Sequence, residues 1–344
     1  MSRSVAVLGA GSWGTALAIH LARVGHDVRL WGRDTAFVQD VAARRANAVY
    51  LPGITLPSAV TMTASLEEAA AGAEVVVSAL PSHGCRAVMR AVRPHLAASA
   101  VIVSATKGLE TDTLLRMSEV IVEETGGEKP VVVLSGPSFA QEVAQQLPTA
   151  VLVASSDRGA LEIVQDEFRG PYFRLYGSPD VIGVELGGAL KNVIAIAAGV
   201  VEGLGLGHNA LAALITRGLA EIGRLACAAG AQRETSAGLS GLGDLVLTCT
   251  GSLSRNRRVG LELARGRPIR EILASTKMVA EGVKTTSVAL ALGVRYGVEL
   301  PITTQMAAVL DQRSDVRSAL DALMLRPQRT ELEHSAGGPP AASR

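Results

Sequence analysis

The chain carries near its start the stretch Val5-Ala6-Val7-Leu8-Gly9-Ala10-Gly11-Ser12-Trp13-Gly14. Its first four residues form an apolar run typical of a buried strand, and the residues that follow it have the pattern of a helix. The glycines have the spacing Gly-x-Gly-x-x-Gly at this strand-to-helix turn. Gly9 permits a tight turn, Gly11 lets a pyrophosphate approach the backbone, and Gly14 allows the helix to pack closely on the strand. The stretch therefore predicts a Rossmann-type unit that binds a dinucleotide.

The sequence after this unit extends it into a larger sheet. Apolar strand candidates alternate with helical stretches as far as about residue 180, and they cover residues 27–31, 74–80, 100–105, 130–134, 149–154 and 172–176. Beyond them, nearly all of the sequence up to about residue 325 has the pattern of helices with glycine-rich joints. We therefore predict an α/β fold: an N-terminal Rossmann-type domain with a parallel, doubly wound sheet (1–180), an all-helical C-terminal domain (181–330) and a flexible tail (331–344).

The composition narrows the class of protein. The chain has 344 residues, of which 48% are hydrophobic, and its net charge is +1, so binding of nucleic acid through bulk charge is not expected. Three cysteines lie far apart and fit neither a disulfide framework nor a metal site: Cys85, Cys227 and Cys249. An apolar strand starts too early for a signal peptide, and the most apolar helix is interrupted by charges. We expect a cytoplasmic protein with no metal and no membrane span.

The end of the second strand bears on the choice of cofactor. An acidic residue there would bind the ribose 2′-hydroxyl of NAD, but the strand ends at Trp31-Gly32-Arg33-Asp34. Gly32 leaves space, and Arg33 offers a planar cation suited to a 2′-phosphate. Asp34 is placed as an N-cap of the next helix. We predict that NADP(H) is preferred and NAD(H) tolerated; the alternative is that Arg33 is an ordinary surface charge.

Two loops follow strand candidates at the edge where open α/β sheets bind ligands. The first spans residues 104–110, and its Lys107 could contact the cofactor or the substrate. The second spans residues 135–140, where Gly136 and Ser138 could offer backbone and hydroxyl donors. Each loop alone is a weak indication, because Gly-Pro-Ser is also a common turn.

The helical half adds a polar cluster. Ser254, Arg255 and Asn256 are adjacent donors that suit a phosphate group. Upstream of them, Asp244 could hold a substrate hydroxyl or pair with Lys191. The alternative for the cluster is a solvated basic face of a helix.

Lys191 lies within the apolar run 187–199. Burying an unpaired ammonium is costly, so this lysine needs either a function or a partner. At helical spacing it shares a face with small residues, and we expect a ligand to lie against that face. As an ammonium it could protonate a ketone while hydride arrives, and as a neutral amine it could take the proton from an alcohol. The alternative is a lysine that snorkels to solvent or pairs with a core carboxylate.

The chain resembles the bacterial NAD(P)-dependent glycerol-3-phosphate dehydrogenases. The matching motifs run in the order of that family and comprise residues 9–16, 106–108, 136–140, 188–192, 241–244 and 254–258. The resemblance implies reversible reduction of dihydroxyacetone phosphate to sn-glycerol 3-phosphate, the precursor of the phospholipid backbone. Two rivals remain open at this point: a β-hydroxyacid dehydrogenase, and a non-catalytic NAD(P)H sensor in which the lysine and the phosphate cluster would be idle.

The resemblance also implies roles for particular residues. It makes Lys191 the catalytic proton acceptor for oxidation. The residues expected to hold the substrate are Lys107, Gly136, Ser138, Lys191, Asp244, Ser254, Arg255 and Asn256. Those expected to hold the cofactor are Gly9, Gly11, Ser12, Trp13, Gly14, Arg33, Lys107, Ala140, Arg255, Val279 and Glu281. The partner is a phosphorylated triose, and the assembly stays open, with a homodimer as one candidate.

Overall fold

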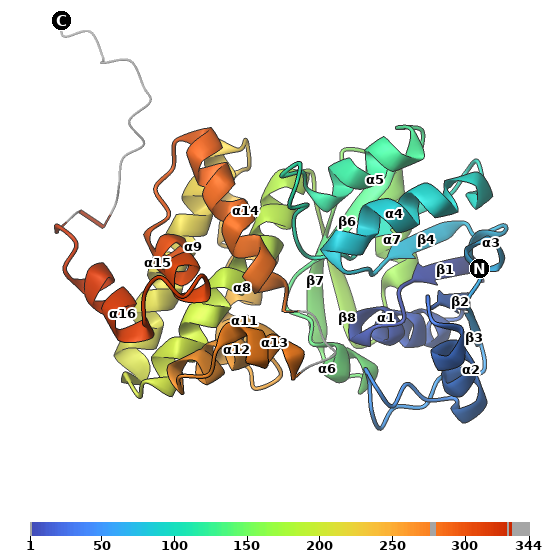
Figure 1. Cartoon of the computed structure of the whole chain (residues 1–344). Coiled ribbons are helices and arrows are strands. Elements are labelled where there is room, and N and C mark those ends of the chain that lie inside the picture. Colours follow the sequence, from blue (N-terminus) through green and yellow to red (C-terminus); the bar gives the residue numbers. More distant parts are fainter. Residues whose placement is uncertain (1, 276–279, 329, 332–344) are drawn as a thin grey trace, which may run out of the picture.

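A computed structural model describes residues 2–275, 280–328 and 330–331. In these ranges an eight-stranded sheet flanked by helices lies beside a bundle of helices (Figure 1). The strands are β1 (Ser4–Leu8), β2 (Asp27–Trp31), β3 (Val60–Thr63), β4 (Val75–Ser78), β5 (Val101–Ser104), β6 (Val131–Ser135), β7 (Thr149–Ala154) and β8 (Phe173–Ser178). Their order in the sheet is β3-β2-β1-β4-β5-β6-β7-β8. The Rossmann-type α/β fold predicted from the sequence is therefore confirmed.

The sheet is covered on both faces. Its helices are α1 (Ser12–Arg23), α2 (Thr35–Arg44), α3 (Leu66–Ala70), α4 (Ser82–Val92), η1 (Arg93–His95), α5 (Met117–Thr125), α6 (Ala140–Ala144) and α7 (Arg158–Phe168). One apolar core joins the sheet to α1, α2, α6 and α7, and a second joins its other face to α3, α4 and α5. Strands buried on both faces explain the near-continuous Val, Ile and Leu runs in the sequence.

The prediction of a parallel sheet is wrong for part of it. Strands β1 to β6 are parallel, but β7 runs antiparallel to β6, and β8 is parallel to β7. The connection between β6 and β7 stays at the carboxyl end of β6, because its short helix α6 packs against α1. The next strand must therefore run back along the sheet. Strand β3, which the sequence analysis did not identify, forms the opposite edge.

The helical part is built around one long helix, α8 (Val181–Gly203). Around it lie α9 (Gly207–Ala228), α10 (Arg233–Ser236), η2 (Leu239–Gly243), α11 (Asp244–Thr250), α12 (Arg255–Ala264), α13 (Ile269–Ala274), α14 (Glu281–Tyr296), α15 (Pro301–Leu310) and α16 (Val316–Met324). In the described part of the chain, α8 is the one helix long and apolar enough to cross a membrane, but 89% of its apolar window is buried within the protein. Its burial is that of a core helix, as the sequence predicts.

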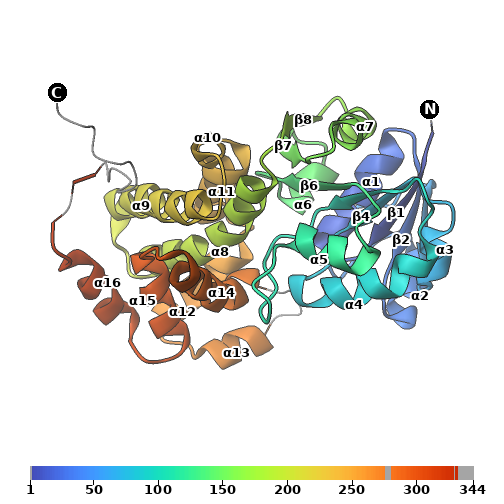
Figure 2. The same cartoon turned by 90° about the horizontal axis from the view of Figure 1, so that it is seen from above.

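Helix α8 also connects the two parts, because it starts directly after β8 and packs against the end of β6 (Figures 1 and 2). A methyl group on Gly188 would collide with the Ser135 side chain, and one on Gly187 would lie 2.9 Å from the Ser240 carbonyl. The protein itself therefore occupies part of the face that the sequence analysis left bare for a ligand. Gly187 and Gly188 instead allow α8 to pack closely against the end of the sheet and against η2.

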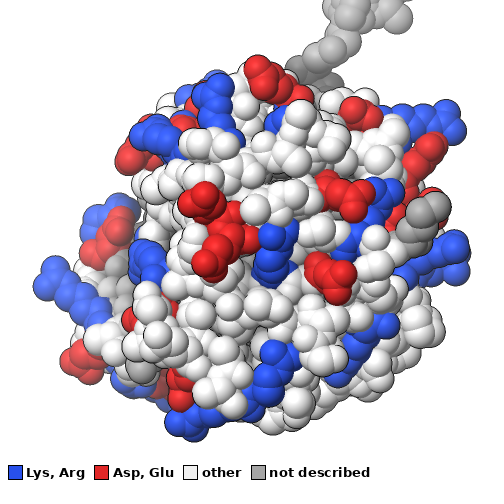
Figure 3. Space-filling model, turned by 90° about the vertical axis from the view of Figure 1, so that its right-hand side faces the viewer, with Lys and Arg blue, Asp and Glu red and all other residues white. Residues whose placement is uncertain are grey.

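The surface is mixed in charge. On the face turned to the viewer in Figure 3, Lys and Arg side chains are interspersed with Asp and Glu, and no extended basic surface forms there. This agrees with the net charge of +1.

Candidate active site

The turn between β1 and α1 has the geometry of a phosphate-binding turn. Gly9 has a φ of 113°, and a methyl group there would lie 2.7 Å from the Ala79 carbonyl oxygen. A methyl group on Gly14 would collide with the Gly9 carbonyl, so this glycine permits the close packing of α1. Gly11, the N-cap of α1, faces open space, and no side chain caps the helix there. The helix N-terminus is thus available to an anion, and the turn fits a dinucleotide.

Two further candidate cofactor residues lie close to this turn. Trp13 is partly buried, and its Nε1 has no hydrogen-bond partner among the described residues. Ala140 starts α6, which packs on α1. Ser12 is the first residue of α1. The structure therefore places Ser12 and Trp13 in the first turn of α1, and Ala140 on a helix that packs against α1.

The end of β2 agrees with the predicted cap. Asp34 accepts a hydrogen bond of 2.8 Å from the Phe37 amide and caps α2, which confirms the prediction for this residue. Its carboxylate is therefore engaged, while Arg33 is exposed and has no hydrogen bond or ion pair among the described residues. A methyl group on Gly32 would lie 2.9 Å from Val38, so packing of α2 also requires this glycine.

Lys191 lies at the centre of a buried polar group. Its Nζ pairs with Asp244 Oδ1 and donates a hydrogen bond of 2.8 Å to Thr248 Oγ1. Asp244 and Thr248 come from η2–α11, which packs against α8, and Thr248 donates in turn to the Asp244 carbonyl at 2.6 Å. The residue is 5% exposed and Asp244 is 1% exposed. Of the alternatives left open, the pairing with Asp244 is the one that the structure shows.

Lys107 joins the same group from the sheet. Its Nζ donates to Asp244 Oδ2 at 2.7 Å and to the Gly136 carbonyl at 2.9 Å. The Ser138 hydroxyl also donates to that carbonyl, at 3.0 Å. Asp244 thus holds one ammonium group on each of its two carboxylate oxygens. These contacts bring together the two predicted loops, residues 104–110 and 135–140, and Asp244 of the helical half.

This environment changes the acid–base properties of Lys191. Burial lowers its pKa to about 7, because the ammonium loses its hydration; the charge of Asp244 opposes this effect and the charge of Lys107 adds to it. Near neutral pH the side chain therefore populates both its charged and its neutral form. This is the condition under which one group can serve as acid in one direction and base in the other.

The predicted phosphate cluster lies at the N-terminus of α12, and its three members have different surroundings. Ser254 caps the helix by accepting from the Arg257 amide at 3.2 Å, which leaves its own proton free to donate. Asn256 donates to Asn192 at 2.8 Å and accepts from the Gly282 amide at 3.0 Å, so its side chain ties α8 to α14.

Arg255 differs from its two neighbours in the cluster. It is exposed and has no hydrogen bond or ion pair among the described residues. Nearby protein still desolvates its guanidinium, which lowers its pKa, and the charge of Glu281 opposes the shift. A cation without a partner at a helix N-terminus is suited to an anionic ligand.

Glu281, at the start of α14, bridges the two parts of the molecule. Its carboxylate accepts from the Ser82 amide at 3.1 Å and from the Ser82 hydroxyl at 2.7 Å. Ser82 starts α4, just beyond the carboxyl end of β4, so Glu281 lies at the ligand-binding edge of the sheet. Val279, the other cofactor candidate of this segment, lies outside the described residues.

Sequence reasoning assigned no role to three residues of this site: Thr248, Asn192 and Ser82. A signal existed for Thr248, which lies four residues after Asp244 and therefore on the same helix face. Asn192 follows Lys191 directly within a quoted motif. No local pattern marks Ser82, whose partner is 199 residues away. Among the described residues no group of His, Cys, Asp and Glu could hold a metal ion.

A Rossmann-type sheet, a helical second domain and a buried lysine at their junction together define a two-domain NAD(P)-dependent dehydrogenase. Residues 4–161 and 180–321 match the N- and C-terminal domains of the NAD-dependent glycerol-3-phosphate dehydrogenases. The chain belongs to this family and is an NAD(P)-dependent oxidoreductase. Membership of this family argues against the two alternatives raised by the sequence, a β-hydroxyacid dehydrogenase and a non-catalytic NAD(P)H sensor.

Individual relatives agree with this assignment. The chain is 56% identical to a glycerol-3-phosphate dehydrogenase [NAD(P)+] of Koribacter versatilis, across 96% of this chain and 99% of the relative. It is 52% identical to that of Syntrophotalea carbinolica, across 96% and 100%. The crystal structure of the Coxiella burnetii glycerol-3-phosphate dehydrogenase is 41% identical and superposes with a TM-score of 0.91, covering 94% of this chain and 99% of that one.

Proposed function

We propose that this chain interconverts dihydroxyacetone phosphate and sn-glycerol 3-phosphate, with Lys191 as the catalytic acid and base. The observation that carries this assignment is the buried contact of Lys191 with Asp244 and Thr248, together with a pKa of about 7. The product supplies the backbone of glycerophospholipids. When bound, the nicotinamide supplies the hydride, and the protein has to provide orientation and the proton.

The proton chemistry follows from the surroundings of Lys191. In reduction, the ammonium donates a proton to the carbonyl oxygen of the substrate and becomes neutral. In oxidation, the neutral amine accepts the proton of the substrate hydroxyl. Asp244 keeps the amine in place in both states, because its carboxylate also remains paired with Lys107. Thr248 provides a second hydrogen bond that fixes the direction of Nζ.

The phosphate end of the substrate is assigned to the N-terminus of α12. Arg255 is a cation there with no ion pair to any described residue, Ser254 has a hydroxyl proton to donate, and the helix dipole favours an anion. Asn256 contributes by holding this turn against Asn192 and Gly282. Lys107, Gly136 and Ser138 approach the same substrate from the sheet.

We propose that the two domains bind different ligands. Residues 1–180 hold the cofactor through the turn Gly9–Gly14 and through Arg33, and residues 181–330 complete the substrate site. Gly11 faces open space and the N-terminus of α1 carries no cap, so these residues fit a pyrophosphate. From the family resemblance we also assign Ala140, Arg255 and Glu281 to the cofactor. We assign residues 331–344 to a tail outside both domains; Leu332 to Arg344 lie outside the described residues.

A direct assay tests the proposal. NADPH oxidation should require dihydroxyacetone phosphate, and a β-keto acid should not replace it. Lys191→Ala should lower kcat by about a hundredfold or more, the usual scale for an acid–base group, with the Kd for NADPH unchanged. Lys129→Ala serves as the matched control, because Lys129 is partly exposed and, among the described residues, its ammonium bonds to the Ala98 carbonyl and to no group of the site. Near-normal turnover of Lys191→Ala would remove this lysine from the mechanism.

The cellular setting is part of the proposal. All three cysteines are unpaired in the structure, which is consistent with a reducing compartment and supports a cytoplasmic location. A location in an oxidising compartment, shown by fractionation, would contradict it.

A further inference from the structure

Helix α8 carries a buried carboxylate, Glu185, upstream of Lys191. This carboxylate accepts from Arg116 Nη1 at 2.7 Å, from the Ser118 amide at 2.8 Å and from the Ser118 hydroxyl at 2.5 Å. Arg116 is the N-cap residue of α5, and Ser118 lies in the first turn of that helix. A buried charge is costly unless it is paired and hydrogen-bonded, and here all the donors come from one place. Glu185 therefore fixes the start of α5 against α8.

Arg116 also ends the loop that carries Lys107. This loop, residues 105–116, joins β5 to α5. Its two ends lie side by side, because Leu109 and Arg116 form an antiparallel bridge. Leu109 comes two residues after Lys107, so the contact of Arg116 with α8 is made close to the lysine in space as well as at the far end of the loop.

The loop reaches from the sheet to the helical part (Figure 2). Leu109 is buried in the apolar core of the helices, and Leu114 packs against the same core with a φ of 64°, which is unfavourable for a bulky side chain. On the sheet side, Arg86 of α4 holds Glu110 with two hydrogen bonds of 2.8 and 2.7 Å. Surrounding contacts must maintain such a backbone conformation, so the shape of the loop depends on its partners on both sides.

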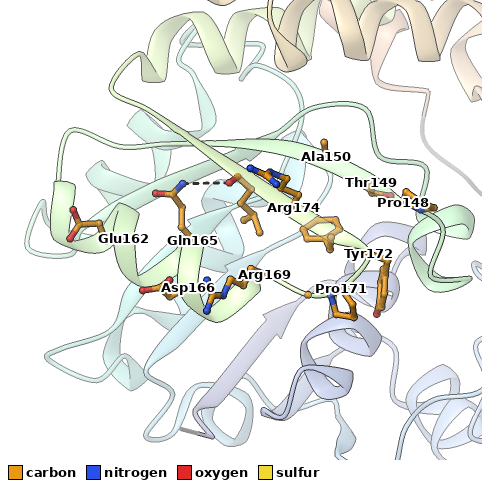
Figure 4. A pocket seen from close by; sticks show the side chains of 13 residues that line it. Pro148, Thr149, Ala150, Glu162, Gln165, Asp166, Arg169, Pro171, Tyr172 and Arg174 are labelled. Carbon is orange, nitrogen blue, oxygen red and sulfur yellow. Dashed lines mark hydrogen bonds between the residues drawn. The ribbon is translucent and has the colours of Figure 1, made fainter.

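The contacts of the loop lie between packed elements and not in an open groove. A groove of about 770 Å³ lies along α7 and β8 (Figure 4), and its lining residues include none of the loop and none of α8. The loop instead joins α4, α8 and α11 through three ion pairs: Arg86 with Glu110, Arg116 with Glu185, and Lys107 with Asp244. A change in one of these pairs should therefore shift the position of the others.

We propose that Glu185 is a positioning residue of the active site: through Arg116 it holds the loop so that Lys107 stays on Asp244. The inference rests on the proposed function, in which Lys107 and Asp244 hold the substrate. Lys107 reaches Asp244 at 2.7 Å and the Gly136 carbonyl at 2.9 Å, and both distances depend on where the loop lies. Misplacing a group by about 1 Å through a remote substitution can cost about a hundredfold in rate. A carboxylate that does not touch the substrate can in this way control its binding.

Chemical labelling tests the position of Lys107 without reference to activity. Glu185→Gln removes the charge that holds Arg116, and the loosened loop should release Lys107 from its two acceptors. Acetylation of Lys107 by acetic anhydride in the full chain, followed by mass spectrometry of its peptides, should become severalfold faster. Lys129, partly exposed and outside the loop, is the internal reference. A parental labelling rate of Lys107 in Glu185→Gln overturns the proposal.

A second buried carboxylate of the helical domain provides the matched control. Glu221 is as deeply buried as Glu185, and it accepts hydrogen bonds from the Ile302 amide and from the Thr303 amide and hydroxyl. These donors belong to α15, far along the chain from the loop. Glu221→Gln should therefore destabilise the protein without changing the labelling rate of Lys107 or the KM for dihydroxyacetone phosphate. Equal effects of both substitutions would make Glu185 a general stability residue and overturn the proposal.

Steady-state kinetics test the consequence for the substrate. Glu185→Gln should raise the KM for dihydroxyacetone phosphate about tenfold, the lower end for loss of a charge-assisted contact, and leave kcat within a few-fold. Lys107→Met should raise the KM at least as much, and adding Glu185→Gln to it should cause no further loss, because the carboxylate acts through this lysine. Losses that multiply would overturn the proposal. An unchanged KM in Lys107→Met would instead contradict the proposed substrate role of Lys107, and labelling would still decide whether Glu185 positions it.

A variant on the loop side covers the case in which Glu185→Gln does not fold. Arg116→Met cuts the same contact and leaves Glu185 with its two hydrogen bonds from Ser118. It should reproduce both the faster labelling of Lys107 and the higher KM. Parental values of both in Arg116→Met would overturn the proposal.

Discussion

Lys191 and Asp244 form an ion pair that is almost wholly removed from solvent, although they lie 53 residues apart in the sequence. Removing one partner of such a pair leaves the other charge uncompensated in the interior, which is strongly unfavourable. Asp244 also binds Lys107, so the carboxylate is shared between one fully buried and one partly exposed ammonium. This arrangement gives the pH dependence of the enzyme a definite sign.

Activity should depend on pH in opposite ways for the two directions. Oxidation needs neutral Lys191, so its kcat/KM should rise with pH and level off above about 7. Reduction needs the ammonium and should fall over the same range. The neighbours should move this midpoint in opposite directions: Lys107→Met removes a like charge and shifts it upward, and Asp244→Asn removes the counter-charge and shifts it downward. Initial rates measured between pH 5.5 and 9 give the midpoint of each pH profile, and we expect each substitution to move it by roughly one pH unit or less. If both substitutions moved the midpoint in the same direction, the assignment of Lys191 would be contradicted.

Arg255 should determine binding of the substrate phosphate. Loss of a charge-assisted hydrogen bond costs about 1.5–3 kcal/mol, so Arg255→Gln should raise the KM for dihydroxyacetone phosphate about ten- to a hundredfold. It should also weaken NADPH if this arginine contacts the cofactor. Arg258→Gln is the matched control, because it lies on the same helix, is exposed and has no partner among the described residues. An unchanged KM in Arg255→Gln would make the cluster a solvated helix face.

Glycines of α8 and α12 support the site by letting these two helices approach each other closely. A methyl group on Gly199 would collide with the Arg257 carbonyl, and one on Gly260 would collide with the Ile196 carbonyl. Gly260→Ala should therefore separate α8, which carries Lys191, from α12, which carries Arg255. Forced overpacking costs about 1–3 kcal/mol, measurable as a lower urea midpoint. Gly84→Ala in α4 meets no atom within 4 Å and should instead gain up to about 1 kcal/mol; equal effects of both would refute this explanation.

Much of the site could be predicted because it is encoded locally. The glycine turn of residues 9–14, the cap at Asp34 and the helix around Lys191 each depend on neighbours in the sequence. The pairing of Lys191 with Asp244 was one of two alternatives, since residue type alone does not show that a carboxylate 53 residues away meets the lysine in space. The roles of the individual site residues remain predictions.

Other features depend on distant contacts and leave no local pattern. The antiparallel turn of β7 follows from the packing of α6 on α1, which apolar periodicity does not specify. The bond between Ser82 and Glu281 joins two domains. Asn256 bonds to Asn192, 64 residues away, and residue type alone could not separate this contact from phosphate binding. The cap of α12 by Ser254 is local, but a serine hydroxyl at this position also suits a phosphate, so the sequence could not distinguish the two roles.

Cofactor choice should depend on Arg33. Asp34 Oδ1 accepts the 2.8 Å hydrogen bond of the Phe37 amide and caps α2, which holds the carboxylate at the start of that helix and leaves only Oδ2 for a ribose hydroxyl. Arg33, exposed and unpaired among the described residues, can then pair with the 2′-phosphate of NADP, a contact that NAD lacks. Arg33→Ala should lower kcat/KM for NADPH about tenfold or more and leave NADH within a few-fold, while Arg44→Ala should change neither. Steady-state kinetics with both cofactors decide the matter: an equal loss with both, or a parent that strongly prefers NADH, would leave Arg33 as an ordinary surface charge.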